Sequence, residues 1–150
     1  MAKISDKGLS LIKHFEGCRL EPYRDPVGNW TIGYGHIGPT AEAGKKIAKR
    51  TADKLLRADV TESEGAVGRL IEVDLEQHEF DALVSFTFNV GQGNLHRSTL
   101  RRRLNAGDRE AAANELLRWN KGRIGGVPTT LPGLTRRRRA ERTLFATGHV

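Results

Sequence analysis

The sequence has 150 residues, 37% of them hydrophobic, so it can bury one core of ordinary size and is too short for two full-sized domains. Its 25 Lys and Arg exceed its 18 Asp and Glu by seven, which favours a polyanionic partner such as nucleic acid, a cell envelope or an acidic membrane. The single cysteine excludes an internal disulfide and a cysteine-rich zinc site, and we expect neither a signal peptide nor a membrane span.

The first fifty residues predict one helix followed by a small sheet. Ser5 can accept hydrogen bonds from free backbone N–H groups and so cap a helix over 5–16, which Gly17 then ends. From 19 to 38, prolines and glycines separate short segments, and the residues over 30–34 favour a strand. We therefore expect a small twisted hairpin or meander in this part of the chain.

The rest of the chain is predicted to be mainly helical. Apolar residues recur at helical spacing, or a capping residue opens the segment, over 52–71, 76–89, 98–105, 108–119 and 135–147. The second of these helices has a wide apolar face, which is typical of a helix at the centre of a bundle. Glycines and prolines interrupt residues 120–133, which we expect to form a long irregular loop.

The predicted fold class is α+β and mainly helical. It consists of a small N-terminal β-sheet, a long connecting helix and a C-terminal helical lobe, with a cleft between the sheet and the helices. We expect one domain over 1–150. Within it, the sheet-bearing lobe should span about 14–50, and the helical lobe about 51–150, with the helix over 5–16 packed on it.

Two acidic residues in the N-terminal region meet the needs of glycoside hydrolysis, which uses a proton donor on one side of the bond and a carboxylate on the other. Glu16 ends an apolar helix, where partial burial would keep its carboxyl protonated. Asp25 lies in a turn rich in proline and glycine, where water keeps it ionised. Thr31 follows on the expected strand, and its hydroxyl could hold a water between itself and Asp25.

These residues form a motif that resembles the signature of the phage-type lysozymes, glycoside hydrolase family 24. It runs Glu16-Gly, seven residues, Asp25, five residues, and then Thr31-Ile-Gly-Tyr-Gly-His36, and the resemblance continues through 81–91, 98–100 with 104–105, and 133–145. The resemblance implies a lysozyme-like fold and an endolysin that cuts the β-1,4 bond between N-acetylmuramic acid and N-acetylglucosamine in peptidoglycan. Glu16 would be the general acid, and Asp25 with Thr31 would hold the water, with inversion at the anomeric carbon.

The resemblance also implies roles for residues beyond these three. Ile37, Phe88 and Asn89 match positions that contact the saccharide, although Phe88 could equally belong to the core and Asn89 could only close its helix. Arg137 matches a position whose guanidinium approaches the catalytic glutamate. We expect His36 to support the hairpin or the acid through a hydrogen bond.

Three other functions stay open at this point. A lytic transglycosylase would need the glutamate alone, so the presence of both Asp25 and Thr31 favours hydrolysis. A peptidoglycan-binding module would bind without turnover. The arginine runs over 101–103 and 136–139 could grip nucleic acid, but no recognition motif accompanies them. We interpret both runs as a solvated cationic face that favours adsorption to the anionic bacterial envelope.

The expected partners are peptidoglycan and the bacterial envelope, with no specific nucleic acid, and the chain is expected to be a monomer. No cofactor or metal is expected, because His78-Glu79 lacks the second histidine of a zinc-binding helix. The resemblance implies that the protein waits in the host cytoplasm until a holin-type lesion opens the membrane, and then acts on the cell wall in the periplasm.

Overall fold

The computed structural model describes residues 2–150, which form two compact units. The sheet unit is Ile12–Glu62, and the helical unit comprises residues 2–11 together with Ser63–Val150. Their elements together give the α+β, mainly helical fold class that the sequence predicts. The expected single domain, with its lobe limits, stays a prediction.

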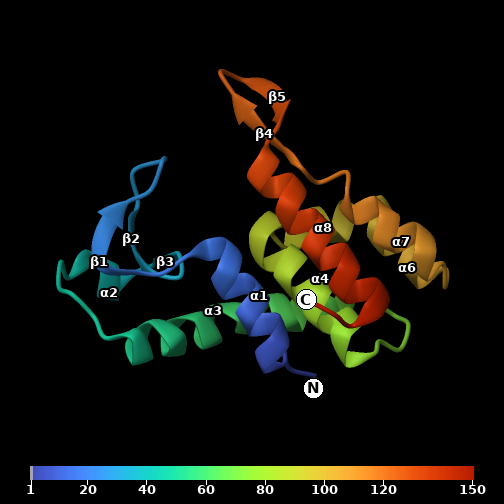
Figure 1. Cartoon of the computed structure of the whole chain (residues 1–150), viewed down its shortest axis with the longest axis horizontal. Coiled ribbons are helices and arrows are strands. Elements are labelled where there is room, and N and C mark those ends of the chain that lie inside the picture. The colour runs from blue at the N-terminus through green and yellow to red at the C-terminus, as the bar shows by residue number, and fades with distance from the viewer. Residues whose placement is uncertain (1) are drawn as a thin grey trace. The chain divides into compact units, whose positions relative to one another are not determined.

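The sheet unit contains a three-stranded antiparallel sheet in the order β1-β2-β3 (Figure 1), formed by β1 (Arg19–Arg24), β2 (Trp30–Gly33) and β3 (His36–Ile37). This confirms the predicted meander. Thr31 in the central strand lies opposite Tyr23 on one side and Ile37 on the other. Because directly opposed residues point to the same face of a sheet, these three side chains share one face.

Three helices flank the strands in the sequence: α1 (Asp6–Glu16), α2 (Pro39–Glu42) and α3 (Lys49–Leu70). The start of α1 is as predicted, since the Ser5 hydroxyl accepts from the Gly8 N–H at 3.3 Å. Gly17 follows its last turn with a φ of 69°, a left-handed value that glycine adopts without strain. α3 begins three residues before the predicted position 52, and the single turn of α2 was not predicted.

Side chains from the strands and helices close the core of the sheet unit. The fully buried apolar residues there come from the ends of α1, from β2 and from α2 and α3: Ile12, Ile32, Ala41, Ala52, Leu56 and Val60. Burying such side chains is the main favourable contribution to folding, worth roughly 1.5–3 kcal/mol for each Leu or Ile.

The helical unit is built around a central helix, α4 (Gln77–Val90), which is buried along Glu79–Thr87 and packs against α8 (Pro132–Thr147), as Figure 1 shows. The other helices of the unit are α5 (Gln92–Arg97), α6 (Thr99–Asn105) and α7 (Arg109–Leu116). The wide apolar face expected of a central helix is confirmed by this burial.

The predicted caps of two helices are also confirmed. The Ser98 hydroxyl accepts from the Arg101 N–H at 3.0 Å at the start of α6, and the Asp108 carboxylate accepts from the Ala111 N–H at 3.0 Å at the start of α7. The predicted ends are less accurate. α7 ends at Leu116 rather than at 119, α8 begins at 132 rather than at 135, and α5 was not predicted.

The prediction of an irregular loop over 120–133 is wrong. Two short strands, β4 (Lys121–Ile124) and β5 (Val127–Thr130), pair in an antiparallel hairpin there. Its two-residue turn is Gly125-Gly126, with φ values of 57° and 80°. Two glycines with positive φ are a strong hairpin signal, because a primed turn matches the twist of its strands.

The prediction of a solvated face over 136–139 is wrong for two of its arginines. Arg137 is 4% exposed and Arg138 is fully buried, whereas Arg136 and Arg139 are exposed. A helix carries consecutive residues to different faces, so a run of four arginines on α8 necessarily points some of them inward. Along residues 2–150, no helix has the length and apolar character that crossing a membrane requires.

Candidate active site

The turn between β1 and β2 holds Asp25 through several hydrogen bonds. Its Oδ1 accepts from the N–H groups of Val27 at 3.0 Å and of Asn29 at 2.8 Å, and its Oδ2 accepts from the Asn29 side-chain amide at 3.3 Å. The backbone closes the same turn, because the Asp25 N–H donates to the Asn29 carbonyl at 2.9 Å. The carboxylate is thus held in one orientation by residues of its own turn.

The same hydrogen bonds keep Asp25 ionised. The Asn29 N–H has the largest effect and lowers the pKa of Asp25 below its ordinary value of 3.8, with further lowering by the Asn29 amide and the backbone at Val27 and Gly28. Partial burial acts in the opposite direction and is outweighed. A carboxylate with a lowered pKa accepts a proton only from a strong donor, or from a nucleophile that gives up its proton as it attacks.

Thr31 shares a partner with Asp25. Its side chain is 3% exposed, and its hydroxyl donates to the Asn29 carbonyl at 3.0 Å. Because a hydroxyl has one proton to give, the Thr31 oxygen is left as an acceptor. Asn29 therefore links the two residues that the sequence analysis paired, although Asn29 itself was not singled out there.

Glu16 is the last residue of α1 and is half-buried. The turn between β2 and β3 lies against it, since a Cβ added at Gly35 would stand 3.3 Å from Oε1 of Glu16. Gly35 also has a φ of 80°, a left-handed value that disfavours other residues. This glycine of the motif thus lets the backbone approach the carboxyl of Glu16 closely.

His36 and Ile37 follow that turn on β3. His36 Nδ1 lies 2.8 Å from Oδ2 of Asp59 on α3, so the pair fastens the hairpin to the helix. The supporting role expected of His36 stays a prediction, and this contact is one through which it would act. Ile37 is 53% exposed, which leaves an apolar surface open to a ligand on the sheet.

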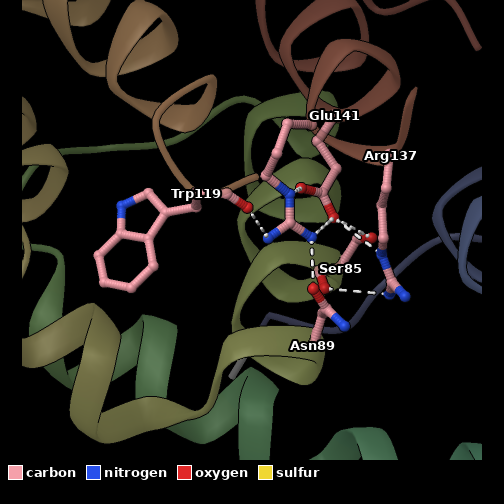
Figure 2. Close-up of polar contacts among 6 residues, drawn as sticks. Ser85, Asn89, Trp119, Arg137 and Glu141 are labelled. Carbon is pink, nitrogen blue, oxygen red and sulfur yellow. Dashed lines mark hydrogen bonds and ion pairs between the residues drawn. The ribbon is translucent and has the colours of Figure 1, made fainter. Parts of the chain in front are cut away.

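The remaining predicted residues belong to the helical unit. Phe88 is half-buried and Asn89 is exposed, at the C-terminal end of α4. Asn89 does more than close its helix, because its Oδ1 accepts from the guanidinium of Arg138 at 2.8 Å. Arg137 is buried, with its Nε 3.3 Å from Oε2 of Glu141 and a terminal nitrogen 3.3 Å from the Ser85 carbonyl (Figure 2).

Glu141 is the carboxylate at the centre of this cluster, and it was not predicted as a functional residue. It is completely buried on α8, 2.8 Å from Nε of Arg138, and it accepts from the Ser85 hydroxyl at 2.7 Å. Loss of water raises the pKa of Glu141 and lowers that of Arg138, while their mutual attraction opposes both changes. The spacing of three and four residues to Arg138 and Arg137 is visible in the sequence, but the burial is not.

The five predicted residues at positions 16, 25, 31, 36 and 37 all lie in the sheet unit. Those at 88, 89 and 137 lie in the helical unit, where the buried arginines connect α8 to the end of α4. Within residues 2–150, no three His, Cys, Asp or Glu side chains gather in a way that could hold a metal ion.

Comparison with known proteins gives a consistent family. The family model described as "Phage lysozyme" matches residues 13–141. The endolysin of Bacillus phage B103 is 50% identical over 97% of this chain, which spans only 54% of that relative's length. The endolysin of Acyrthosiphon pisum secondary endosymbiont phage 1 is 42% identical and is matched over 95% of this chain and 97% of its own length.

A solved structure extends the likeness to the fold. The muramidase domain of SpmX from Asticaccaulis excentricus superimposes with a TM-score of 0.93 at 41% identity, over 98% of this chain and 99% of that one. The matched region of the family model includes every residue of the predicted site, from Glu16 to Arg137. The chain belongs to the phage lysozyme family.

Proposed function

We propose that this protein is a phage endolysin that hydrolyses peptidoglycan as a muramidase, at the β-1,4 bond between N-acetylmuramic acid and N-acetylglucosamine. The observation that carries the proposal is the link through Asn29, which holds an ionised Asp25 and the acceptor oxygen of Thr31 in one turn. Its place within a chain of the phage lysozyme family supports the choice of substrate.

Asp25 and Thr31 would hold the attacking water. Both present acceptor oxygens, since the Thr31 proton is already given to the Asn29 carbonyl. A water that donates one hydrogen to each of them has a lone pair left to attack the anomeric carbon. As the new C–O bond forms, the water loses a proton to the Asp25 carboxylate, and a single displacement inverts the configuration.

Glu16 would be the general acid for the leaving group. As the glycosidic C–O bond breaks, its carboxyl proton passes to the departing sugar oxygen, so no charged alkoxide is released. The close backbone at Gly35 supports this role by fixing the side chain at the end of α1. Two carboxyl groups with separate tasks, one donating and one accepting a proton, are what an inverting glycosidase requires.

The other predicted residues would bind or support. We propose that Ile37, Phe88 and Asn89 contact the saccharide, that His36 steadies the hairpin through Asp59, and that Arg137 has a supporting role. We further propose that the chain acts as one lysozyme-like domain and as a monomer. It would reach the cell wall from the host cytoplasm after a holin-type lesion.

The test compares variants on purified peptidoglycan freed of the outer membrane. Glu16→Gln and Asp25→Asn should each reduce the rate of glycan release by about 10²–10⁴-fold, the usual contribution of a positioned acid or base. Glu21→Gln is a matched control, because Glu21 is an exposed glutamate on β1, and it should keep the wild-type rate.

Mass and reducing-end analysis of the products completes the test. Reducing muramic acid ends from wild type, absent with Glu16→Gln, support the proposal. Anhydro products, lighter by one water, would contradict hydrolysis and indicate a transglycosylase. Binding of peptidoglycan with no release of fragments by the wild-type protein would contradict an enzymatic role altogether.

A further inference from the structure

Arg138 is a fully buried cation whose hydrogen bonds reach two different elements. On α8 its Nε lies 2.8 Å from Oε1 of Glu141, and a terminal nitrogen lies 3.3 Å from Oε2 of the same carboxylate. That terminal nitrogen also donates to Oδ1 of Asn89 on α4 at 2.8 Å. The other terminal nitrogen donates to the Trp119 carbonyl at 3.4 Å.

Further contacts hold the guanidinium in place. Its carbon lies 5.1 Å from the centre of the Phe86 ring, in a cation–π contact. The Phe86 ring itself packs edge to face against Trp119, with 5.6 Å between ring centres. Glu141 is likewise fixed, by the Ser85 hydroxyl at 2.7 Å and by Arg137. Arg138 therefore has little freedom to leave its position.

The direction of the Asn89 amide follows from this geometry. A guanidinium has only donors, so the amide atom that faces Arg138 must be the oxygen. The amide nitrogen, with its two N–H donors, is then left on the other side of the side chain (Figure 2). Because Asn89 is exposed, these donors are available to a ligand in solvent.

We infer that Arg138, held by Glu141, is a positioning residue that orients Asn89 for saccharide binding. By engaging the amide oxygen, it turns the N–H donors of Asn89 toward the ligand. The matching group on the substrate is an acceptor oxygen, such as the carbonyl of an N-acetyl group. The inference rests on the proposed function, since it takes Asn89 to contact the glycan.

Burying the ion pair of Arg138 and Glu141 removes both charges from water, which costs free energy. Replacing a buried ion pair by apolar residues of similar volume is often neutral or stabilising, so a buried ion pair is weak evidence for a stabilising role. Arg138 does join α8 to the end of α4 and to the segment at Trp119, which a purely structural role would also require. The two roles differ in what they predict for substrate binding.

The experiment is a double-mutant cycle on KM and kcat with soluble peptidoglycan strands. Asn89→Ala and Arg138→Met should each raise KM by about three- to tenfold, the size of one neutral hydrogen bond, and leave kcat unchanged. The double variant should have the KM of Asn89→Ala alone, because Arg138 acts only through Asn89. Glu141 keeps Arg137 and Ser85 as partners in Arg138→Met, so the carboxylate is not left uncompensated.

A conservative variant and a matched control complete the experiment. Arg138→Lys keeps a positive charge opposite Glu141, but a single ammonium cannot replace the fork that reaches Asn89 as well, so its KM should rise similarly even if Arg138→Met fails to fold. Arg142→Met is the matched control. Arg142 lies on the same helix and donates to the Asn114 side chain at 2.8 Å on the exposed surface, and its loss should leave KM unchanged.

Two results for the Arg138 variants would overturn the inference. One is an unchanged KM in both Arg138 variants while Asn89→Ala raises it, and the other is an additive rise in the double variant. An unchanged KM in Asn89→Ala would also overturn it, by removing the saccharide contact on which it rests. None of these affects the loss of turnover expected for Glu16→Gln, so a failure of the proposed function is seen separately.

Discussion

The two units of the molecule differ in whether they bury charged side chains. In the helical unit six ionisable side chains are buried: Glu64, Glu79, Asp81, Arg137, Arg138 and Glu141. Among the residues that the structure describes in the sheet unit, none of the Asp, Glu, Lys or Arg side chains is buried, and the buried side chains that carry a polar group are those of Thr31 and Tyr34.

Each buried carboxylate of the helical unit has donors close by. Glu64 accepts from the Ile4 N–H at 2.7 Å, Asp81 accepts from the Ser5 N–H at 2.9 Å, and Glu79 pairs with Arg109 at 2.9 Å. A charge removed from water is tolerated only with such partners. The carboxyl of Asp25, in contrast, is held by its own turn and stays within reach of water. The buried charges thus hold helices and side chains in position, while the two carboxylates of the proposed site lie nearer the surface.

The strongest test of this contrast is Glu141→Leu. It leaves the two buried guanidiniums of Arg137 and Arg138 without their carboxylate, so we expect a loss of about 3–5 kcal/mol in the free energy of unfolding. Urea denaturation followed by circular dichroism measures it. Arg138→Met should cost less, because it leaves Arg137 and Glu141 as a neutral pair.

Asp25→Asn serves as the matched carboxylate variant in the sheet unit. Its side chain is near the surface, so its loss should change the free energy of unfolding by less than about 0.5 kcal/mol. A loss for Asp25→Asn as large as that for Glu141→Leu would break the contrast between the units. So would a Glu141→Leu protein as stable as wild type.

A smaller effect is expected where α1 meets the buried carboxylate of Asp81. A Cβ at Gly8 would stand 2.8 Å from the Asp81 side chain and 2.6 Å from that of Ile4, so Gly8→Ala overpacks a filled contact. We expect it to lower the free energy of unfolding by about 1–3 kcal/mol, despite the higher helix propensity of alanine. The same urea titration measures the change.

Gly68→Ala is the control for Gly8→Ala. Gly68 is an exposed residue within α3, and nothing lies within 4 Å of a Cβ added there. Alanine should therefore stabilise the protein by about 0.5–1 kcal/mol, through helix propensity alone. If both substitutions stabilised the protein, the carboxylate of Asp81 could not be as tightly enclosed as the structure indicates.

Local signals in the sequence were enough to predict most elements of both units. The caps at Ser98 and Asp108 and the glycine after α1 act within a few residues of themselves, so they can be found without knowledge of the fold. The hairpin at Gly125-Gly126 was equally local and could have been found from its two glycines. The three residues matched to the catalytic motif were likewise available from spacing and resemblance.

What could not be predicted depends on contacts between distant residues. Nothing local shows that Arg138 is buried while Arg139 is exposed, since that follows from how α8 packs on α4. The contact of Arg138 with Asn89 joins residues 49 positions apart. Asn29 was missed for a different reason, because its role comes mainly from backbone groups that every residue possesses.

The smallest effect is expected for Asn29→Ala, on the pKa of Asp25. It tests whether hydrogen bonds of the turn keep this carboxylate ionised. Asn29→Ala removes the amide that donates to Oδ2 of Asp25 but keeps the backbone N–H, which has the larger effect on the pKa. Since a lost donor disfavours the ionised form, the pKa of Asp25 should rise part of the way toward 3.8, as measured by NMR titration of its carboxyl carbon.

The pH dependence follows from the sign of that shift. A folded-state pKa below 3.8 means that ionised Asp25 favours the folded state above that pH, and that this contribution is lost as the pH falls through the folded-state pKa. In Asn29→Ala both this loss and the acid limb of kcat/KM should move to higher pH. Val27→Ala, which keeps the N–H that donates to Oδ1, should leave them in place. A lower pKa in Asn29→Ala would mean that the amide does not stabilise the carboxylate, and the turn would then owe its effect to the backbone alone.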